Sequence, residues 1–292
     1  MPEARKIAAN GARAAAAGAP LLRVEDLRID VPADSGARTM VADVSFGLGR
    51  GQSLGLVGES GSGKTLTCRA VLGILPPGCT QAGGRIEFDG QSVTALDEKG
   101  WRRIRSARVG AVFQDPASYL NPSISAGRQL SEVLRVKGGL GRKEAHRRAV
   151  ELLDAVGLRE PERVYKQIPS HLSGGMQQRV MMAMAISCDP DLLVADEPTT
   201  ALDVKTQREI LVLLRELRER LGLAVLFISH DLDVIAEICD EVAVFHHGRI
   251  VEAGRTAAIL EQPTHAHTRD LVASSAVSER WRREEIVEVV DG

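Results

Sequence analysis

The chain has 292 residues, of which 44% are hydrophobic and 26% are charged, and its formal net charge at pH 7 is −2. This composition is typical of a globular protein with enough chain for a large core and for one or two domains. The near-neutral charge and the small aromatic content, 3%, argue against a nucleic acid partner, and the longest apolar run, residues 221–228, is too short to span a membrane.

The first 48 residues are expected to contain an extension and two strands. Residues 1–20 are rich in Ala and Gly, and polar residues and glycines interrupt this weakly apolar stretch. A disordered extension is therefore favoured over a targeting peptide. Residues 21–31 alternate between apolar and polar, as a strand with one exposed face does. The cluster at 32–36 predicts a turn, and residues 40–48 predict a second strand.

A phosphate-binding loop is predicted between the apolar run 53–57, which indicates a buried strand, and the helical pattern of 66–72. The chain reads Gly58-Glu-Ser-Gly-Ser-Gly-Lys64-Thr65 there. Glycines allow positive φ, so successive N–H groups can form an anion-binding concavity at the start of a helix. Lys64 supplies a cation for the β- and γ-phosphates, and Thr65 supplies a hydroxyl for Mg²⁺. A flexible glycine loop is the alternative, but it leaves the flanking strand and helix unexplained. The predicted nucleotide-binding residues are Gly58, Glu59, Ser60, Gly61, Ser62, Gly63, Lys64, Thr65 and Leu66.

Further along the chain, the hydrophobic pattern changes from that of short strands to that of helices, and then to an alternation of helices and strands. Short strands are predicted at 84–90 and 109–113, and the helical patterns between about 115 and 175 indicate an inserted helical subdomain. The remaining elements alternate between helix and strand, which predicts a parallel sheet covered on both faces. They are helices at 129–136, 142–156, 176–187, 205–220 and 231–238, strands at 191–195 and 223–228, and a hairpin of 241–245 with 249–252.

Two acids, Asp196 and Glu197, directly follow the apolar run 191–195. Ligands of open α/β sheets bind at the carboxyl edge, where the phosphate-binding loop also lies. We therefore predict that Asp196 holds Mg²⁺, through water, and that Glu197 orients or deprotonates an attacking water. A solvated pair of helix-capping acids is the alternative, and the buried strand before them disfavours it.

A second helix start reads Leu172-Ser-Gly-Gly-Met-Gln177. Its serine and glycines can present N–H groups and a hydroxyl to phosphate, although alone this pattern is no more than an N-cap. The two anion-binding helix starts are about 110 residues apart in the chain. One nucleotide cannot easily touch both within a monomer.

These motifs, with Ala201-Leu-Asp203 and Ile228-Ser-His230, resemble in order and spacing the ATP-binding subunit of an ABC transporter. The resemblance covers about residues 21–273, between the extension 1–20 and a tail 274–292. It implies a P-loop NTPase fold: an α/β core with a mostly parallel sheet, an N-terminal antiparallel β subdomain and the helical insertion. It also implies ATP and Mg²⁺, and a head-to-tail pair in which ATP lies between the P-loop of one subunit and the signature loop of the other. The signature residues are Ser173, Gly174, Gly175, Met176 and Gln177.

Three further roles follow from the resemblance by matched position. Gln114 corresponds to a glutamine that contacts Mg²⁺ or water at the joint with the helical insertion; the alternative is an ordinary glutamine at a strand end. Asp203 corresponds to an acid that crosses the dimer contact, and a helix N-cap is compatible with that role. His230 corresponds to the histidine that hydrogen-bonds the γ-phosphate, whereas a lone histidine there would more often be structural.

A narrower resemblance is to importers of oligopeptides, dipeptides, nickel and related solutes. It is carried by Phe113-Gln-Asp-Pro116, Leu120-Asn-Pro122, Met176-Gln-Gln-Arg-Val180, Glu197-Pro-Thr-Thr-Ala-Leu-Asp203 and the segment 263–271. It implies a second ATPase subunit, identical or related, two transmembrane permease subunits and an extracytoplasmic solute-binding protein. The ATPase would lie on the cytoplasmic face of the inner membrane, with the surface around 115–135 against the permease. Tyr119 lies in this surface and is equally compatible with an ordinary exposed tyrosine.

Three departures from the family pattern affect the expectations. Many members carry an aromatic residue that stacks on adenine where this chain has Val31. No cysteine follows Cys239, so we expect no iron–sulfur cluster, and the four cysteines fit reduced packing residues. The tail motif of the family usually reads His-Pro-Tyr-Thr, and here it is His265-Ala-His267-Thr268; this His-x-His pair does not make a metal site, because two ligands are too few. The rival functions are a soluble ABC ATPase of DNA repair or translation, which usually needs a long coiled-coil insertion, and a non-catalytic nucleotide-binding partner.

Overall fold

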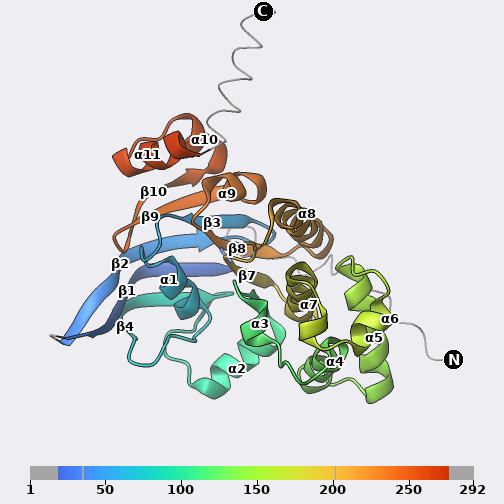
Figure 1. Cartoon of the computed structure of the whole chain (residues 1–292). Coiled ribbons are helices and arrows are strands. Elements are labelled where there is room, and N and C mark those ends of the chain that lie inside the picture. The colour runs from blue at the N-terminus through green and yellow to red at the C-terminus, as the bar shows by residue number, and fades with distance from the viewer. Residues whose placement is uncertain (1–18, 35, 201, 276–292) are drawn as a thin grey trace, which may run out of the picture.

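The computed structural model describes residues 19–34, 36–200 and 202–275 (Figure 1). At its centre is a six-stranded sheet in which β3, β6, β7, β8 and β9 run parallel and β10 pairs antiparallel with β9. In spatial order its strands are β10 (Arg249–Arg255), β9 (Glu241–His246), β3 (Ser53–Val57), β8 (Ala224–Ser229), β7 (Leu192–Asp196) and β6 (Val109–Val112). The predicted mostly parallel sheet is confirmed.

A second, antiparallel sheet is formed by the N-terminal third of the chain. Its order is β2 (Gly36–Leu48), β1 (Leu22–Ala33), β4 (Thr80–Phe88) and β5 (Gln91–Ser92). The predicted turn at 32–36 is shorter than expected, because β1 continues to Ala33 and β2 begins at Gly36. The strand predicted at 84–90 begins earlier, at Thr80, where it pairs with β1.

Helices cover both faces of the six-stranded sheet and form the inserted subdomain at the right of Figure 1. The predicted helices are confirmed within about two residues, except that α4 begins three residues earlier than expected, and α2, α3, α6, α10 and α11 were not predicted individually. The helices are α1 (Lys64–Val71), α2 (Glu98–Ala107), α3 (Pro116–Tyr119), α4 (Ala126–Val136), α5 (Arg142–Ala155), α6 (Pro161–Lys166), α7 (Gly174–Ile186), α8 (Val204–Leu221), α9 (Leu232–Ile238), α10 (Thr256–Glu261) and α11 (Ala266–Ser274), with a 3₁₀ turn at Pro169–His171.

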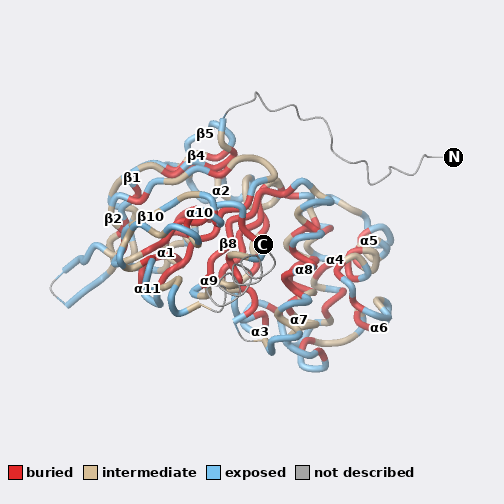
Figure 2. The backbone as a smooth tube through the Cα atoms, turned by 90° about the horizontal axis from the view of Figure 1, so that it is seen from above, coloured by how far each residue is buried: buried red, intermediate tan, exposed pale blue. Residues whose placement is uncertain are grey.

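The strands of the central sheet are buried on both faces, and this explains their continuous apolar runs. Along β8, Val225 and Phe227 point into a core shared with the helical insertion, whereas Leu226 and Ile228 point into a core shared with the antiparallel sheet. Figure 2 shows this buried layer between exposed surfaces. The P-loop strand β3 is fixed in the same way from two sides, with Val57 in the first core and Leu56 in the second.

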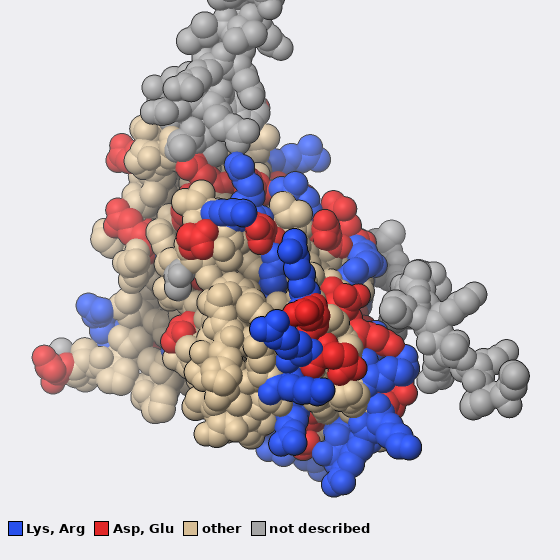
Figure 3. All heavy atoms as spheres, turned by 45° about the vertical axis from the view of Figure 1, so that its right-hand side comes forward, with Lys and Arg blue, Asp and Glu red and all other residues tan. Residues whose placement is uncertain are grey.

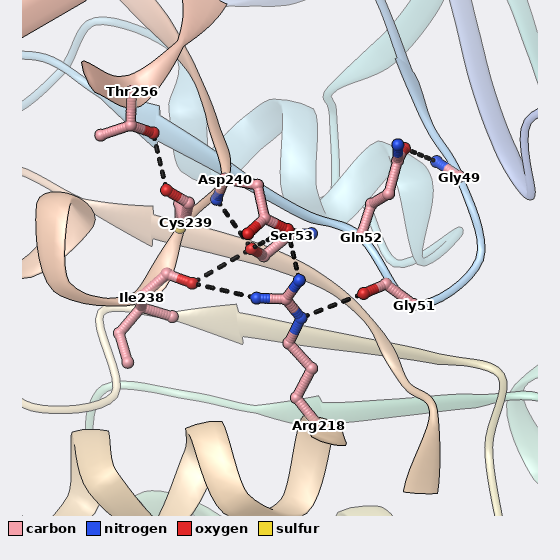
Figure 4. A network of polar contacts seen from close by, with 9 residues as sticks. All are labelled: Gly49, Gly51, Gln52, Ser53, Arg218, Ile238, Cys239, Asp240 and Thr256. Carbon is pink, nitrogen blue, oxygen red and sulfur yellow. Dashed lines mark hydrogen bonds and ion pairs between the residues drawn. The ribbon is translucent and has the colours of Figure 1, made fainter.

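Polar contacts lock the amino edge of the central sheet, opposite the P-loop (Figure 4). The Ser53 hydroxyl donates to Ile238 O at 3.0 Å and accepts from the Asp240 N–H at 2.9 Å. Arg218, near the end of α8, pairs with Asp240 and donates from Nε to Gly51 O at 3.1 Å. The start of β3 is thus tied to α8 and to the loop between α9 and β9.

An ionic ring joins the two sheets. Arg50 and Arg108 each pair with both Asp89 and Asp191, at N···O distances of 2.5–3.2 Å. The Arg108 guanidinium also lies over the Phe88 ring, 4.9 Å from its centroid. Because the four charged side chains are half-buried and come from four separate segments, the ring fixes the antiparallel sheet against the start of β7.

Most of the predicted extension and tail, residues 1–18 and 276–292, lies outside the described residues. Within the described ranges, no helix has the length and apolarity needed to cross a bilayer. All four cysteines are free, and Cys68 and Cys239 are buried as packing residues.

Candidate nucleotide site

The carboxyl ends of the parallel strands bring the predicted site residues to one edge. Val57 is in register with Ser229, Asp196 with Ile228, and Val112 with Ala195. The residues that follow these strands therefore meet there: the P-loop after β3, Gln114 after β6, Glu197 after β7 and His230 after β8. This is the crevice in which open α/β sheets bind ligands.

The P-loop has the backbone conformation that its glycines predict. Gly58, Gly61 and Gly63 have φ values of +150°, +80° and +106°. A Cβ at Gly58 would lie 2.2 Å from Phe245 O, so this position also requires the absence of a side chain. The Gly248 N–H donates to Ser62 O at 3.0 Å, which joins the β9–β10 turn to the loop.

Lys64 is buried at the start of α1 and is held by the loop itself. Its Nζ donates to Gly58 O at 2.7 Å and to Glu59 O at 2.9 Å. Burial lowers the pKa of Lys64, and the nearby carboxylates of Glu197 and Asp196 oppose that shift. A desolvated ammonium surrounded by loop carbonyls is ready to exchange them for phosphate oxygens, which are the stronger acceptors.

Thr65 and Asp196 provide two hard oxygen donors beside Lys64. The Thr65 hydroxyl donates to Asp196 Oδ1 at 3.3 Å. Burial raises the pKa of the Asp196 carboxyl, the Thr65 hydrogen bond lowers it, and the neighbouring Glu197 raises it again. A buried carboxylate with a raised pKa is stabilised by a bound cation. Mg²⁺ prefers such oxygen ligands and completes its shell with phosphate oxygens and water, so these residues fit it.

Glu197 and His230 face each other across the edge of the sheet. Glu197 Oε2 lies 3.3 Å from His230 Nδ1 and accepts from the Thr200 hydroxyl at 2.9 Å. The Glu197 backbone is left-handed, with φ of +48°, and its N–H donates to Ile228 O at 2.9 Å. Such strain in a residue without glycine's freedom is typical of functional positions. Glu197 also lines the cavity beside the P-loop.

Gln114 and the signature loop lie farther from this cavity. Gln114 is exposed two residues after β6, at the same edge. Ser173 is the N-cap of α7 and accepts from the Met176 N–H at 3.3 Å. None of residues 172–177 is among those that line the P-loop cavity. The two anion-binding helix starts are therefore not brought together within the described part of one chain.

Asp203 caps α8 and lies close to the signature helix. Its carboxylate accepts from the Thr206 N–H at 3.0 Å and from the Thr206 hydroxyl at 2.7 Å, which lowers the pKa of Asp203. A Cβ at Gly175 would meet the Thr206 methyl at 2.5 Å. The cap and the signature loop thus form one packed unit, so the N-cap that the sequence allowed as a second role for Asp203 is confirmed.

The sequence analysis missed Met40, which lines the P-loop cavity from β2. It also missed a histidine cluster beside the P-loop. The His246 ring lies 4.0 Å from the His247 ring and 3.9 Å from the His267 ring, between centroids. Burial and the neighbouring His267 lower the pKa of His246, and His265 and Glu59 are close enough to act on it electrostatically. The His-x-His motif pointed to the C-terminal half of this cluster only.

Metal-binding side chains are otherwise sparse. In the ranges that the structure describes, no group of three or more His, Cys, Asp or Glu side chains is arranged to hold a metal ion. The pair formed by Thr65 and Asp196 therefore fits a cation only together with a phosphate ligand.

Comparisons with known proteins agree with this geometry. The ABC transporter family model matches residues 41–200. The chain is 42% identical to the oligopeptide transport ATP-binding protein OppD of Bacillus subtilis over 92% of this chain and 75% of that protein. It is 43% identical to OppD of Salmonella typhimurium over 86% of this chain and 75% of that protein.

A solved structure is similar as well. The dimeric ATP-binding cassette MJ0796, in a post-hydrolysis state with ADP and Pi, superposes with a TM-score of 0.72 at 27% identity. That match covers 80% of this chain and 98% of the other. The resemblance to the oligopeptide importer group and the P-loop NTPase fold class are thereby confirmed. The chain belongs to the ABC transporter family, among its ATP-binding subunits.

Proposed function

We propose that this protein hydrolyses ATP at the P-loop edge and thereby powers an ABC importer of peptides. The observation that carries the proposal is the convergence of Lys64, Thr65, Asp196, Glu197 and His230 at one end of the parallel sheet. These groups are the ones that phosphoryl transfer needs: a cation for the phosphates, oxygen donors for a metal ion, and a base beside them. The peptide solute is proposed from the names of the relatives, and nickel or another small solute is the alternative.

In this proposal each residue has one task. The P-loop amides and Lys64 neutralise charge on the β- and γ-phosphates; Thr65, Gln114 and Asp196 would hold Mg²⁺, which would supply further charge neutralisation. Glu197 positions and deprotonates the attacking water, and His230 donates to the γ-phosphate. Because bonding to the protein changes little during transfer, catalysis depends on positioning and on electrostatic stabilisation.

The test of the catalytic assignment is Glu197→Gln. The amide keeps the side-chain volume but cannot accept the water's proton, so we expect a loss of steady-state ATPase of about 10²–10⁴-fold. ATP affinity should stay within a few-fold of the wild-type value, because the phosphate contacts are unchanged. The matched control is Glu261→Gln, an exposed carboxylate at the end of α10. Glu197→Gln activity equal to that of the wild type would remove Glu197 from the mechanism.

The signature loop completes the site from a second subunit in this proposal. Ser173, Gly174 and Gly175 open α7 with the N–H groups of its first turn and a hydroxyl, and these groups suit the γ-phosphate. Met176 and Gln177 follow in the same turn; Gln177 Nε2 donates to Pro169 O at 2.9 Å and so fixes the loop. Asp203 would contact the partner subunit next to this loop. Support for pairing comes from the dimeric cassette that the chain resembles.

The helical insertion offers a docking surface for the permease subunits. Tyr119 is 53% exposed and stacks on Phe113, with ring centroids 4.6 Å apart, and Ile124 is 41% exposed nearby in sequence. Figure 3 shows a broad area with few charged side chains beside the Lys and Arg residues of the insertion. Because Tyr119 stacks on Phe113, the residue before Gln114, a permease bound at Tyr119 would be coupled to the edge of the nucleotide site. The protein would then lie on the cytoplasmic face of the membrane.

Co-purification tests the transport assignment. Purified from its native cells in detergent, the affinity-tagged protein should bring down two membrane subunits, and a peptide-loaded binding protein should stimulate ATPase in the reconstituted complex. The Tyr119→Asp variant should lose the membrane subunits while it keeps ATP binding. If the tagged protein instead retained DNA or ribosomes, and salt weakened that binding, the result would favour the soluble ATPase function.

A further inference from the structure

The cavity beside the P-loop is too small for a whole nucleotide. Its volume is about 220 Å³, and six of its eight lining residues belong to the P-loop and the first turn of α1. Sites that enclose a whole small molecule are commonly about 300–1,000 Å³. The cavity therefore accommodates phosphates, and the nucleoside must lie on its rim. The two lining residues from outside the P-loop segment are Met40 and Glu197.

Met40 is held rigidly at that rim by its backbone. Its carbonyl oxygen lies 3.2 Å from the position of a Cβ at Gly63 and 2.4 Å from that of a Cβ at Gly248. The glycines thus let β2 approach the end of the P-loop closely. Val41, the next residue along β2, points into the core, so the Met40 side chain projects from the other face of the strand.

Arg38 extends the surface that Met40 provides. Its Nη2 donates to Met40 Sδ at 2.8 Å, and residues two apart on a strand share a face. Val31, at the position where many family members carry an aromatic residue, is the cross-strand partner of Arg38 and does not line the cavity. A polarisable thioether and a planar guanidinium both favour the face of an aromatic ring.

We propose that Met40, supported by Arg38, is the platform on which the nucleobase of bound ATP rests. This inference depends on the proposed function, because it assumes that the triphosphate occupies the P-loop. The platform contacts the face of the base and offers no acceptor to its edge. The site therefore discriminates weakly between adenine and guanine, and ATP and GTP should bind with affinities within a few-fold of each other.

The test compares ATP, GTP and inorganic tripolyphosphate by calorimetric titration, all with Mg²⁺. Sulfur–ring contacts of about 0.3–1.5 kcal/mol correspond to a loss of about 2- to 12-fold in affinity at 1.4 kcal/mol per tenfold. Met40→Ala should weaken ATP and GTP by this factor and leave tripolyphosphate unchanged. Met40→Phe, which provides a ring, should restore or exceed the wild-type affinity for ATP. Thr39→Ala, on the same strand, is the matched control.

Each outcome separates the inference from the proposed function. Equal weakening of ATP and tripolyphosphate by Met40→Ala would mean that Met40 only supports the P-loop, and the inference would be overturned. Unchanged ATP affinity in Met40→Ala would overturn it as well. If Met40→Ala fails to fold, Met40→Leu and Arg38→Ala are titrated instead, with the same contrast between nucleotide and tripolyphosphate. A wild-type protein that binds none of the three ligands would contradict the proposed function itself.

Discussion

Gly58→Ala tests whether the P-loop is shaped by its contact with β9. In the wild type this glycine has φ of +150°, and an added Cβ would lie 2.2 Å from Phe245 O, a backbone atom that cannot rotate away. Gly61 is the matched position, because its φ is +80° and a Cβ there would meet nothing within 4 Å. Both alanine variants carry backbone strain of roughly 1–2 kcal/mol, but only Gly58→Ala adds overpacking, typically about 1–3 kcal/mol.

The difference between the two variants is therefore the measured quantity. At about 2–4 °C per kcal/mol, Gly58→Ala should melt roughly 2–12 °C below Gly61→Ala, with urea midpoints in the same order. Differential scanning calorimetry without nucleotide checks this, because ligand binding would shift both melting temperatures. Equal melting temperatures for the two variants would refute the idea that β9 restricts the start of the loop.

Two further predictions concern stability. Burial and the neighbouring His267 lower the pKa of His246, so below about pH 6.5 the unfolded chain binds more protons than the folded protein. The free energy of unfolding should therefore fall as the pH decreases from about 7.5 to 5.5, and it should fall less in the His246→Phe variant. Thermal melts at several pH values check this, and parallel curves for the two proteins would exclude the histidine cluster as the cause. The second prediction concerns the ionic ring: Arg108→Met opens this half-buried ring and should lower the free energy of unfolding by about 1–2 kcal/mol. Its control, Arg147→Met on the exposed face of α5, should change the free energy of unfolding by less than about 0.5 kcal/mol. Similar urea midpoints for these two arginine variants would contradict the stabilising role of the ring.

Much of the candidate site was predictable because its signals are local in sequence. The P-loop, the acids after β7 and His230 after β8 each follow an apolar strand, and parallel strands end at one edge by construction. The cap at Asp203 was likewise readable from its position before α8. What the sequence could not provide was distance, such as the 3.3 Å between Glu197 and His230.

The elements that were missed depend on tertiary contacts. α2 contains Gly100 and several charged residues, which weaken its helical signal, and Arg105 anchors it by donating to Leu72 O and Gly73 O. α11 is anchored by Glu252, whose carboxylate accepts from the Thr264 N–H at 2.7 Å and from the His265 N–H at 2.9 Å. Met40 lies at the site because β2 packs closely against Gly248 in the β9–β10 turn, and no local pattern encodes that contact.

The most direct test of the central claim is a crosslink between two subunits. Gly61→Cys and Ser173→Cys are placed on separate copies of the Glu197→Gln protein, with the partly exposed Cys79 and Cys188 replaced by serine. A short bis-maleimide should join the mixed copies with ATP and Mg²⁺ present and not without nucleotide. Glu160→Cys in place of Ser173→Cys is the control and should give no product.

If each site is formed by the P-loop of one subunit and the signature loop of the other, the crosslinked dimer forms only with nucleotide and only when the two cysteine variants are mixed. If the wild-type protein hydrolyses ATP but the Glu197→Gln copies never yield the crosslink between positions 61 and 173 with ATP bound, the account is contradicted.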